Sequence, residues 1–265
     1  MTDWTGADPS PQPPPARGGS RSTSAPPPLA GGDRGEGSAP IHDMTTAPIH
    51  LAGERLMLDP AGALFWPATA LLAVSDLHLE KGSSYARRGQ LLPPWDTRVT
   101  LDRLTLLLRR WTPRVVVALG DSFHDADGAG RLPSGERARL KAMTEAHRFI
   151  WVAGNHDPHP PQGVGGAWVE AFVTTTLAFR HQAAAAAIPG EVCGHHHPKA
   201  AVPARGGSVS RPCFVADARR LMLPAFGAYT GGLDVSDPAI ARLFPRGGRV
   251  FLLGKERLFS FTLGR

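Results

Sequence analysis

The stretch ALLAVSDLHL, residues 70–79, decides the fold. Its first half is an apolar run typical of a buried strand, and polar side chains follow that run at once. The same form recurs in RVVVALGD, residues 114–121, and in RFIWVAGNHD, residues 148–157. Because ligands of open α/β folds bind at the carboxyl ends of the strands, we expect the polar residues that follow the three runs to converge.

Helical spacing lies between these strand-like runs. From Asp96 to Trp111 the apolar residues recur mostly at three or four positions apart, and Asp96 is the expected N-cap. A second helix is expected near Ser134 to His147. The resulting βαβαβ order predicts a buried parallel sheet that helices cover.

The flanking segments read as further strands. IHLAGERLMLD, residues 49–59, a turn at residues 60–63 and LFWP predict an early hairpin. From residue 169 onward, few helical stretches separate the strand-like runs VEAFVTTTLAFRH, PGEVCGHHHP, RPCFVAD, RRLMLP, RVFLLGK and RLFSFTL. A second, mixed or largely antiparallel sheet is therefore expected. We predict an α/β fold, a four-layer αββα sandwich of two facing mixed sheets with helices outside.

Five short islands of metal-ligand chemistry run through this frame. They are Asp76-Leu77-His78, Gly120-Asp121, Gly154-Asn155-His156-Asp157, a lone His181 and Gly194-His195-His196-His197. In an extended segment residues i and i+2 point the same way, so Asp76 and His78 would face one metal while Leu77 turns into the core. The same geometry would pair His195 with His197 and turn His196 away.

The five islands together favour a site for two metals. Asp121 is the best candidate for a carboxylate shared by two ions, because it sits between two small-residue turns. Asn155 can offer a neutral carbonyl oxygen to the second ion. An Asp-X-His pair standing alone, or His181 alone, would suit a half-buried structural role equally well. The ordered set instead predicts a two-metal hydrolytic site.

The order of these motifs resembles that of the calcineurin-like metallophosphoesterases. Within that superfamily, longer stretches look like the bacterial ligase-associated DNA damage response endonucleases: SDLHLEKGSSYARRGQLLPPWDT, LGDSFHD, WVAGNHD, GHHHPKA and LPAFGAYTGGLDV. The resemblance covers about residues 49 to 263 and implies the four-layer fold.

The resemblance also assigns residues to two metal positions. One metal would be held by Asp76, His78, Asp121 and His197, and the other by Asp121, Asn155, His181 and His195. His156 would stay off the metals, beside the phosphate, and would help the leaving oxygen depart, with Asp157 orienting it. This ligand set suits two divalent ions of Mn, Fe or Zn, and the resemblance favours Mn.

The expected activity is phosphodiester hydrolysis of DNA, in which a hydroxide held between the two ions attacks phosphorus in line. The resemblance implies an endonuclease in DNA repair, associated with a ligase, helicase and exonuclease set. Two alternatives remain: a phosphodiesterase or phosphatase acting on small nucleotides, which would share the metal site, and a non-catalytic scaffold of the same fold. A scaffold would be expected to have lost His156 or a ligand, and this chain has lost neither.

Substrate contacts are expected from the loop GSSYARRGQ, residues 82–90, which follows the first ligands. Arg87 and Arg88 could reach flanking phosphates, with Lys81 nearby. A solvent-exposed connecting segment is the alternative interpretation. His124 lies close enough in sequence to Asp121 to contact substrate or to hold a metal ligand in place.

Composition divides the chain. Nine prolines fall in the first 40 positions, among many Gly, Ser and Ala, so residues 1–48 are expected to be disordered and residues 49–265 to form the metallophosphoesterase domain. We also expect translation to start at or near Met44. After residue 48 the chain carries 26 basic and 18 acidic residues, a surplus that suits a polyanionic partner such as DNA.

Cellular location and redox state are also constrained. The first residues lack an apolar run long enough for a signal peptide, and no window predicts a transmembrane helix, so a cytoplasmic protein without membrane contact is expected. A redox or structural zinc protein would need more than two cysteines. Cys193 and Cys213 are expected to be buried thiols.

Overall fold

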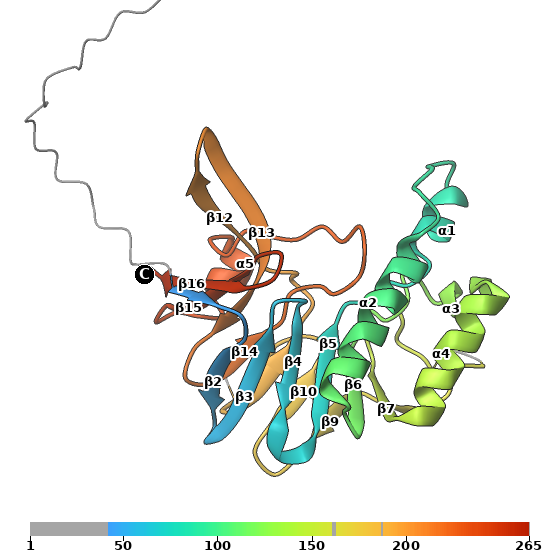
Figure 1. Cartoon of the computed structure of the whole chain (residues 1–265), viewed down its shortest axis with the longest axis horizontal. Helices are drawn as coiled ribbons and strands as arrows, with labels where there is room; N and C mark the ends of the chain where they lie inside the picture. Colours follow the sequence, from blue (N-terminus) through green and yellow to red (C-terminus); the bar gives the residue numbers. More distant parts are fainter. Residues whose placement is uncertain (1–41, 161–162, 187, 265) are drawn as a thin grey trace, which may run out of the picture. The chain divides into compact units, whose positions relative to one another are not determined.

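Two β-sheets build the fold in the computed structural model, which describes residues 42–160, 163–186 and 188–264 (Figure 1). Within these residues the first sheet runs in the order β2-β3-β4-β5-β6-β7-β8, and its β5 to β8 are parallel. Its strands are β2 (Ala47–Leu51), β3 (Glu54–Asp59), β4 (Ala63–Trp66), β5 (Leu71–Ser75), β6 (Val115–Leu119), β7 (Arg148–Val152) and β8 (Ala167–Val169).

The second sheet is mixed and runs in the order β1-β16-β15-β13-β14-β11-β10-β9, with β12 paired to β13. Its strands are β1 (His42–Met44), β9 (Ala171–Val173), β10 (Ala178–Arg180), β11 (Glu191–Cys193), β12 (Lys199–Ala204), β13 (Gly207–Ala216), β14 (Arg220–Met222), β15 (Gly248–Leu253) and β16 (Leu258–Leu263). Strand β12 was not expected from the sequence; it forms a hairpin with β13 that projects from the sheet in Figure 1.

Alternating side chains of β5 explain how the layers form. Ala73 points into the core between the sheets, where it belongs to the same cluster as Phe214 and Leu221 of the second sheet. Leu72 and Val74 point the other way, into the core beneath the helices. Burial on both faces is the reason that the parallel strands are continuous apolar runs.

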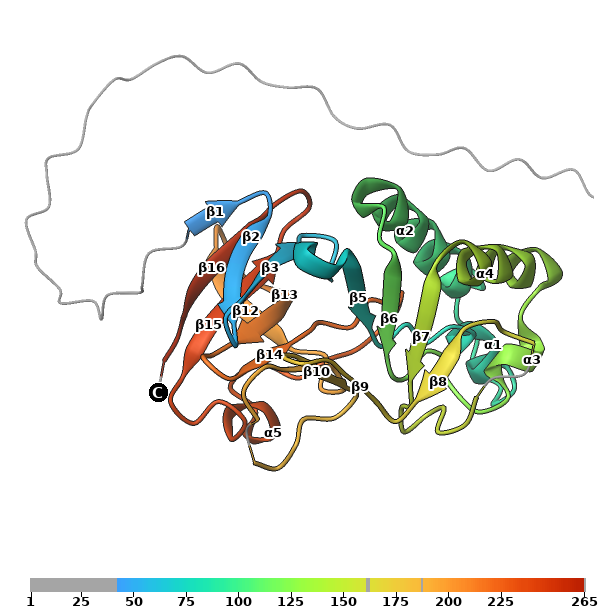
Figure 2. The same cartoon turned by 90° about the horizontal axis from the view of Figure 1, so that it is seen from below.

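Two helices cover the outer face of the first sheet, α2 (Asp96–Trp111) and α4 (Ser134–Ala146), as Figures 1 and 2 show. The α2 bounds match the expectation, but Asp96 is the first helical residue rather than the N-cap. Its Oδ2 accepts a hydrogen bond from the backbone N–H of Gly82 at 3.1 Å. Asp96 therefore ties α2 to the short helix α1 (Lys81–Ala86) instead of capping α2.

The predicted fold class is confirmed, with two mixed sheets and helices on the outside. The outer layer of the second sheet is thin, because the described helix on that side, α5 (Pro238–Ala241), is short. Ile240 of α5 packs in a third core cluster that also contains Cys193 and Cys213. Both cysteines are free and buried, and burial raises the pKa of each thiol.

Strand pairing begins earlier than residue 49, where the sequence placed the start of the domain. His42 to Met44 of β1 pair with β16, and Ala47 and Pro48 belong to β2. A proline is tolerated there because β2 is an edge strand, which has an unpaired side. Most of residues 1–48 lie outside the described residues. No described helix is both long enough and apolar enough to cross a membrane.

Candidate metal centre

The five islands of metal-ligand chemistry meet at the ends of five strands. Three of them follow β5, β6 and β7 of the first sheet, as the sequence predicted, and two follow β10 and β11 of the second. The predicted ligands brought together in this way are Asp76, His78, Asp121, Asn155, His181, His195 and His197. The centre is therefore assembled from loops at one edge of both sheets.

The ligand-bearing loops are not extended, and this corrects the geometry assumed from the sequence. Asp76 and His78 have φ angles of 53° and 43°, Asp121 has 46°, and His195 and His197 have 72° and 48°. Left-handed backbone is uncommon for residues with a side chain and occurs where the surrounding structure holds it. Here the backbone N–H of His78 donates to the carbonyl of Asp121 at 2.8 Å, so the two loops fix each other.

Glycines in the motifs allow the loops to approach closely. A Cβ atom at Gly194 would collide with Oγ of Ser75 and with Oδ2 of Asp76. A Cβ atom at Gly154 would collide with the backbone nitrogen of Asp121. These glycines therefore belong to the motifs because a side chain would push the ligand loops apart.

Asp76, His78 and His197 form the first ligand cluster, with their candidate ligand atoms within 4.8 Å of one another. Nε2 of His197 lies 3.2 Å from Oδ1 of Asp76 and 3.3 Å from Nε2 of His78. Oδ2 of Asp76 accepts from the Ser75 hydroxyl and from the His195 backbone N–H. Its Oδ1 is buried and has no hydrogen-bond partner in the described part of the chain, so it remains available for a cation.

Asp121, His181 and His195 form the second cluster. Nε2 of His181 lies 3.4 Å from Oδ2 of Asp121, 3.1 Å from Nδ1 of His195 and 2.9 Å from Oδ1 of Asn155. The same Oδ2 of Asp121 lies 3.9 Å from Nε2 of His78 in the first cluster. Asp121 thus stands between the two clusters, where a shared carboxylate is needed.

The charge states of His78, His195 and the two carboxylates suit metal ligation. Burial lowers the pKa of His78 to about 3 and that of His195 to about 4, so both imidazoles are neutral and can ligate at pH 7. Burial alone would raise the carboxyl pKa values of Asp76 and Asp121, but the neighbouring histidines outweigh it and lower both. Ionised carboxylates beside neutral imidazoles suit Mn, Fe or Zn.

His181 differs from His78 and His195 in the direction of its pKa shift. Burial lowers its pKa, but the carboxylates of Asp121 and Asp76 outweigh burial and raise the pKa to about 9. The metal-free protein therefore holds a proton on His181 at pH 7. That proton would have to leave for the ring to ligate an ion.

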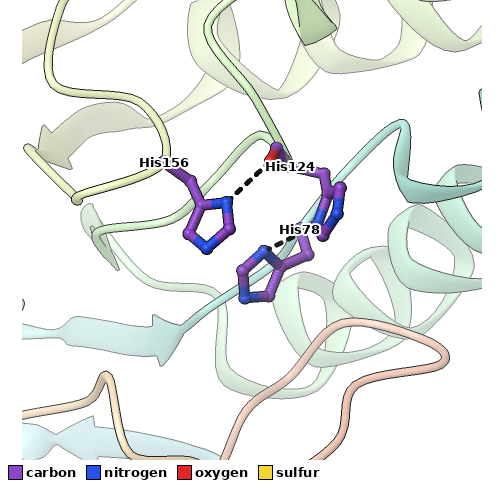
Figure 3. A group of neighbouring side chains, drawn as sticks. All are labelled: His78, His124 and His156. Atoms are coloured by element: carbon purple, nitrogen blue, oxygen red, sulfur yellow. Dashed lines mark hydrogen bonds between the residues drawn. The ribbon is translucent and has the colours of Figure 1, made fainter. Parts of the chain in front are cut away.

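His78, His124 and His156 form a third group, on the loops after β5 and β6 and the loop after β7 (Figure 3). Nδ1 of His156 donates to the carbonyl oxygen of His124 at 2.8 Å, which leaves Nε2 as the ring nitrogen on the side of the centre. This Nε2 lies 4.0 Å from Oδ2 of Asp121, and the side chain is 39% exposed. A ring in this position can exchange a proton with a ligand that enters from solvent.

Asp157 does not orient His156 in the described residues, contrary to the expectation. Its Oδ2 accepts from the backbone N–H groups of Ser122 and Phe123 at 2.8 and 3.0 Å. Burial raises the pKa of Asp157 to about 7. Asp157 therefore positions the loop that carries Asp121, and the His124 carbonyl takes the role of orienting His156.

The expected substrate residues are only partly brought to the centre. Arg87 is exposed and forms an ion pair with Asp127 at 3.1 Å. Lys81 donates to the carbonyl of Tyr229 at 2.9 Å. Burial lowers the pKa of His124 to about 4, and the nearby charges of Lys81 and Arg88 contribute. Lys81 and Arg88 thus lie near enough to His124 to act on its charge, and these three side chains are called the rim below. Arg87 is instead paired with Asp127.

Two further side chains, Ser75 and His196, lie next to the predicted ligands. The Ser75 hydroxyl donates to Asp76, a contact that the sequence analysis missed although Ser75 directly precedes the ligand. His196 packs its ring edge-on against His195, at 4.8 Å between centroids, and belongs to none of the three groups found among the described residues.

The chain was compared with family models and with solved structures. A family model described as calcineurin-like phosphoesterase matches residues 69–217. The structure of Pseudomonas putida nuclease MPE is similar, with a TM-score of 0.63 and 28% identity, and the match covers 82% of this chain and 100% of that one. The E. coli phosphoesterase Yfce matches with a TM-score of 0.39 and 14% identity over 73% and 99% of the two chains.

The search of curated protein sequences found no match. The family model nevertheless spans more than half of the chain, and the predicted ligands of both metal positions meet in the fold. The chain belongs to the calcineurin-like phosphoesterase family, whose members are metal-dependent phosphoesterases.

Proposed function

We propose that this protein is a two-metal phosphodiesterase that cleaves DNA internally. The observation that carries the proposal is the position of Oδ2 of Asp121, 3.9 Å from His78 and 3.4 Å from His181. One carboxylate oxygen between two sets of imidazole ligands suits a pair of neighbouring ions. A single ion would use only one of the two ligand clusters.

Different residues of the chain would hold the two ions and donate a proton. Asp76, His78, His197 and the shared Asp121 would hold one ion, and Asp121, Asn155, His181 and His195 the other. Ions held by these residues would supply an activated water and would neutralise the phosphate oxygens. His156 presents Nε2 to the substrate side, with Nδ1 fixed by the His124 carbonyl, so its imidazolium form can donate a proton to the departing oxygen.

DNA is the proposed substrate for two reasons. The chain is similar to Pseudomonas putida nuclease MPE at 28% identity. The chain after residue 48 also carries 26 basic and 18 acidic residues, and Lys81, Arg88 and His124 lie at the rim. Manganese as the resident metal, and a role in DNA repair beside a ligase, helicase and exonuclease, rest on the resemblance of the motifs alone.

Circular DNA offers the most discriminating assay of this function. Metal-free protein is reloaded with Mn, Fe(II), Zn or Mg and incubated with closed circular single-stranded DNA, closed circular duplex DNA, cyclic nucleotides and a chromogenic phosphodiester. Because a circle has no ends, its conversion to linear fragments requires internal cleavage. His156→Ala, loaded with the same metal, controls for contaminating nucleases.

The outcomes separate the alternatives. Cleavage of a circle by the wild type and not by the variant supports an endonuclease. Hydrolysis of cyclic nucleotides with circles left intact would instead assign the small-nucleotide alternative. No hydrolysis of any substrate with any metal would favour a non-catalytic scaffold.

A further inference from the structure

A pocket of about 310 Å³ adjoins the second ligand cluster. It is lined by the loop after β7, by the end of β10 and by Glu170, and the lining includes two of the ligands, Asn155 and His181. A ligand in this pocket would therefore lie next to a ligand at the metal centre. The proposed mechanism uses neither Arg180 nor Glu170 of its lining.

Arg180 supplies the positive charge of this pocket. It is the last residue of β10 and directly precedes His181, so the strand that delivers the ligand also delivers the guanidinium. Its Nε is buried and has no hydrogen-bond partner among the described residues. By contrast, Arg87 and Arg131 are engaged in ion pairs, with Asp127 and Asp125.

The chemistry of a half-buried guanidinium without a partner favours an anionic oxygen ligand. Arginine presents a planar fork of N–H donors that matches two phosphate oxygens, and burial strengthens such contacts by excluding water. Glu170 lines the same pocket, but it is exposed and forms no ion pair with Arg180 in the described part of the chain. Solvent screens an exposed carboxylate more strongly than a buried guanidinium.

We propose that Arg180 and this pocket form a subsite for the phosphate next to the scissile phosphate of a nucleic-acid strand. The inference rests on the proposed function, because it needs the scissile phosphate to bind at the metal centre. It adds a residue outside the rim formed by Lys81, Arg88 and His124. The chain would then hold a strand at two consecutive phosphates, one at the metals and one at Arg180.

Binding of small nucleotides tests the subsite without relying on turnover. Calorimetry on the Mn-loaded protein compares thymidine 3′,5′-bisphosphate with the 3′- and 5′-monophosphates, so either strand direction is covered. We expect the wild type to bind the bisphosphate about tenfold more tightly than either monophosphate. Arg180→Gln should lose this preference and keep its monophosphate affinity, metal content and thermal midpoint.

Two further variants make the comparison specific. Arg148→Gln is the matched control, because Arg148 is an exposed arginine at the opposite end of β7, and it should keep the full preference. Arg180→Lys keeps the positive charge but loses the planar pair of N–H donors. Its preference for the bisphosphate over the monophosphates should be at least about threefold smaller than that of the wild type. If Arg180→Gln fails to fold, the Arg180→Lys result decides.

The outcomes that overturn the subsite differ from those that overturn the function. Equal affinity of the wild type for all three nucleotides would exclude the subsite. A full preference in Arg180→Gln, or in Arg180→Lys, would exclude Arg180 as the residue responsible. A wild type that binds the bisphosphate more tightly but hydrolyses no phosphodiester would leave the subsite standing and contradict the proposed function.

Discussion

The metal centre and the rim beside it differ in how firmly the fold holds their side chains. Asp76, His78, Asp121 and His181 are all at most 5% exposed, on loops that the two sheets and their hydrogen bonds fix. Arg88 of the rim and its neighbour Arg87 are exposed, and Arg87 is paired with Asp127. Buried ligand geometry follows from where strands end, whereas the direction of an exposed charged side chain depends on neighbours that the sequence does not reveal.

The largest effect is expected at the residue that joins the two ligand clusters. Asp121→Ala should abolish hydrolysis and remove both ions, because the shared oxygen is lost from both sides. Metal analysis and turnover of the purified variant measure this. Asp102→Ala, an exposed carboxylate on α2, is the control and should retain both ions. Two ions and near-normal turnover in Asp121→Ala would refute the bridging role.

Replacement of His156 tests whether this residue contacts substrate or ligates a metal. His156→Ala should lower turnover by roughly 100-fold to 10,000-fold with metal content unchanged, because the ring contacts substrate and not the ions. Single-turnover kinetics with metal analysis on the same sample give both quantities. A parallel loss of metal would place His156 among the ligands.

Arg88 of the rim and Arg87 beside it form a matched pair of exposed arginines. Arg88→Ala should raise the Michaelis constant for an oligonucleotide about threefold to tenfold and flatten its dependence on salt, because one phosphate contact is lost. Arg87→Ala should have a smaller effect, since Arg87 is held by Asp127. A chromogenic phosphodiester should be hydrolysed normally by both. Equal losses on both substrates would place these side chains at the reacting phosphate instead.

The smallest effect concerns stability and pH in the metal-free protein. Burial raises the pKa of Asp157 from 3.8 to about 7, so its contribution to stability is full below pH 3.8 and is lost as the pH rises through 7. Asp157→Asn removes this loss. Relative to wild type, the free energy of unfolding of the variant should therefore gain about 2.5 kcal/mol between pH 5 and pH 8, as measured by urea unfolding with chelator present. An unchanged difference between the two proteins would show that Asp157 does not titrate in this range.

Much of the fold and the ligand set could be predicted from strand ends. The three apolar runs before Asp76, Asp121 and Asn155 became neighbouring parallel strands, and parallel strands bring their carboxyl ends to one edge. His181 carried no multi-residue signature, yet it lies in the second ligand cluster because β10 pairs with β11.

Other features depend on contacts that are distant in sequence. The left-handed backbone of Asp76 and His195 follows from loops that lock against each other, not from local propensity. Asp157 accepts hydrogen bonds from the backbone N–H groups of Ser122 and Phe123 and so holds the loop that carries Asp121, rather than the ring of His156. Arg180 was missed because a single arginine before a lone histidine has no pattern that marks it.

The direct test of the central claim is whether two ions sit together at Asp121. Electron paramagnetic resonance of the protein titrated with Mn should show a spin-coupled pair, saturating at two ions per chain. Asp121→Asn should bind fewer ions and lose the coupled signal. Saturation at one ion, or two ions with only uncoupled signals in the wild type, would contradict the account of a bridged two-metal centre.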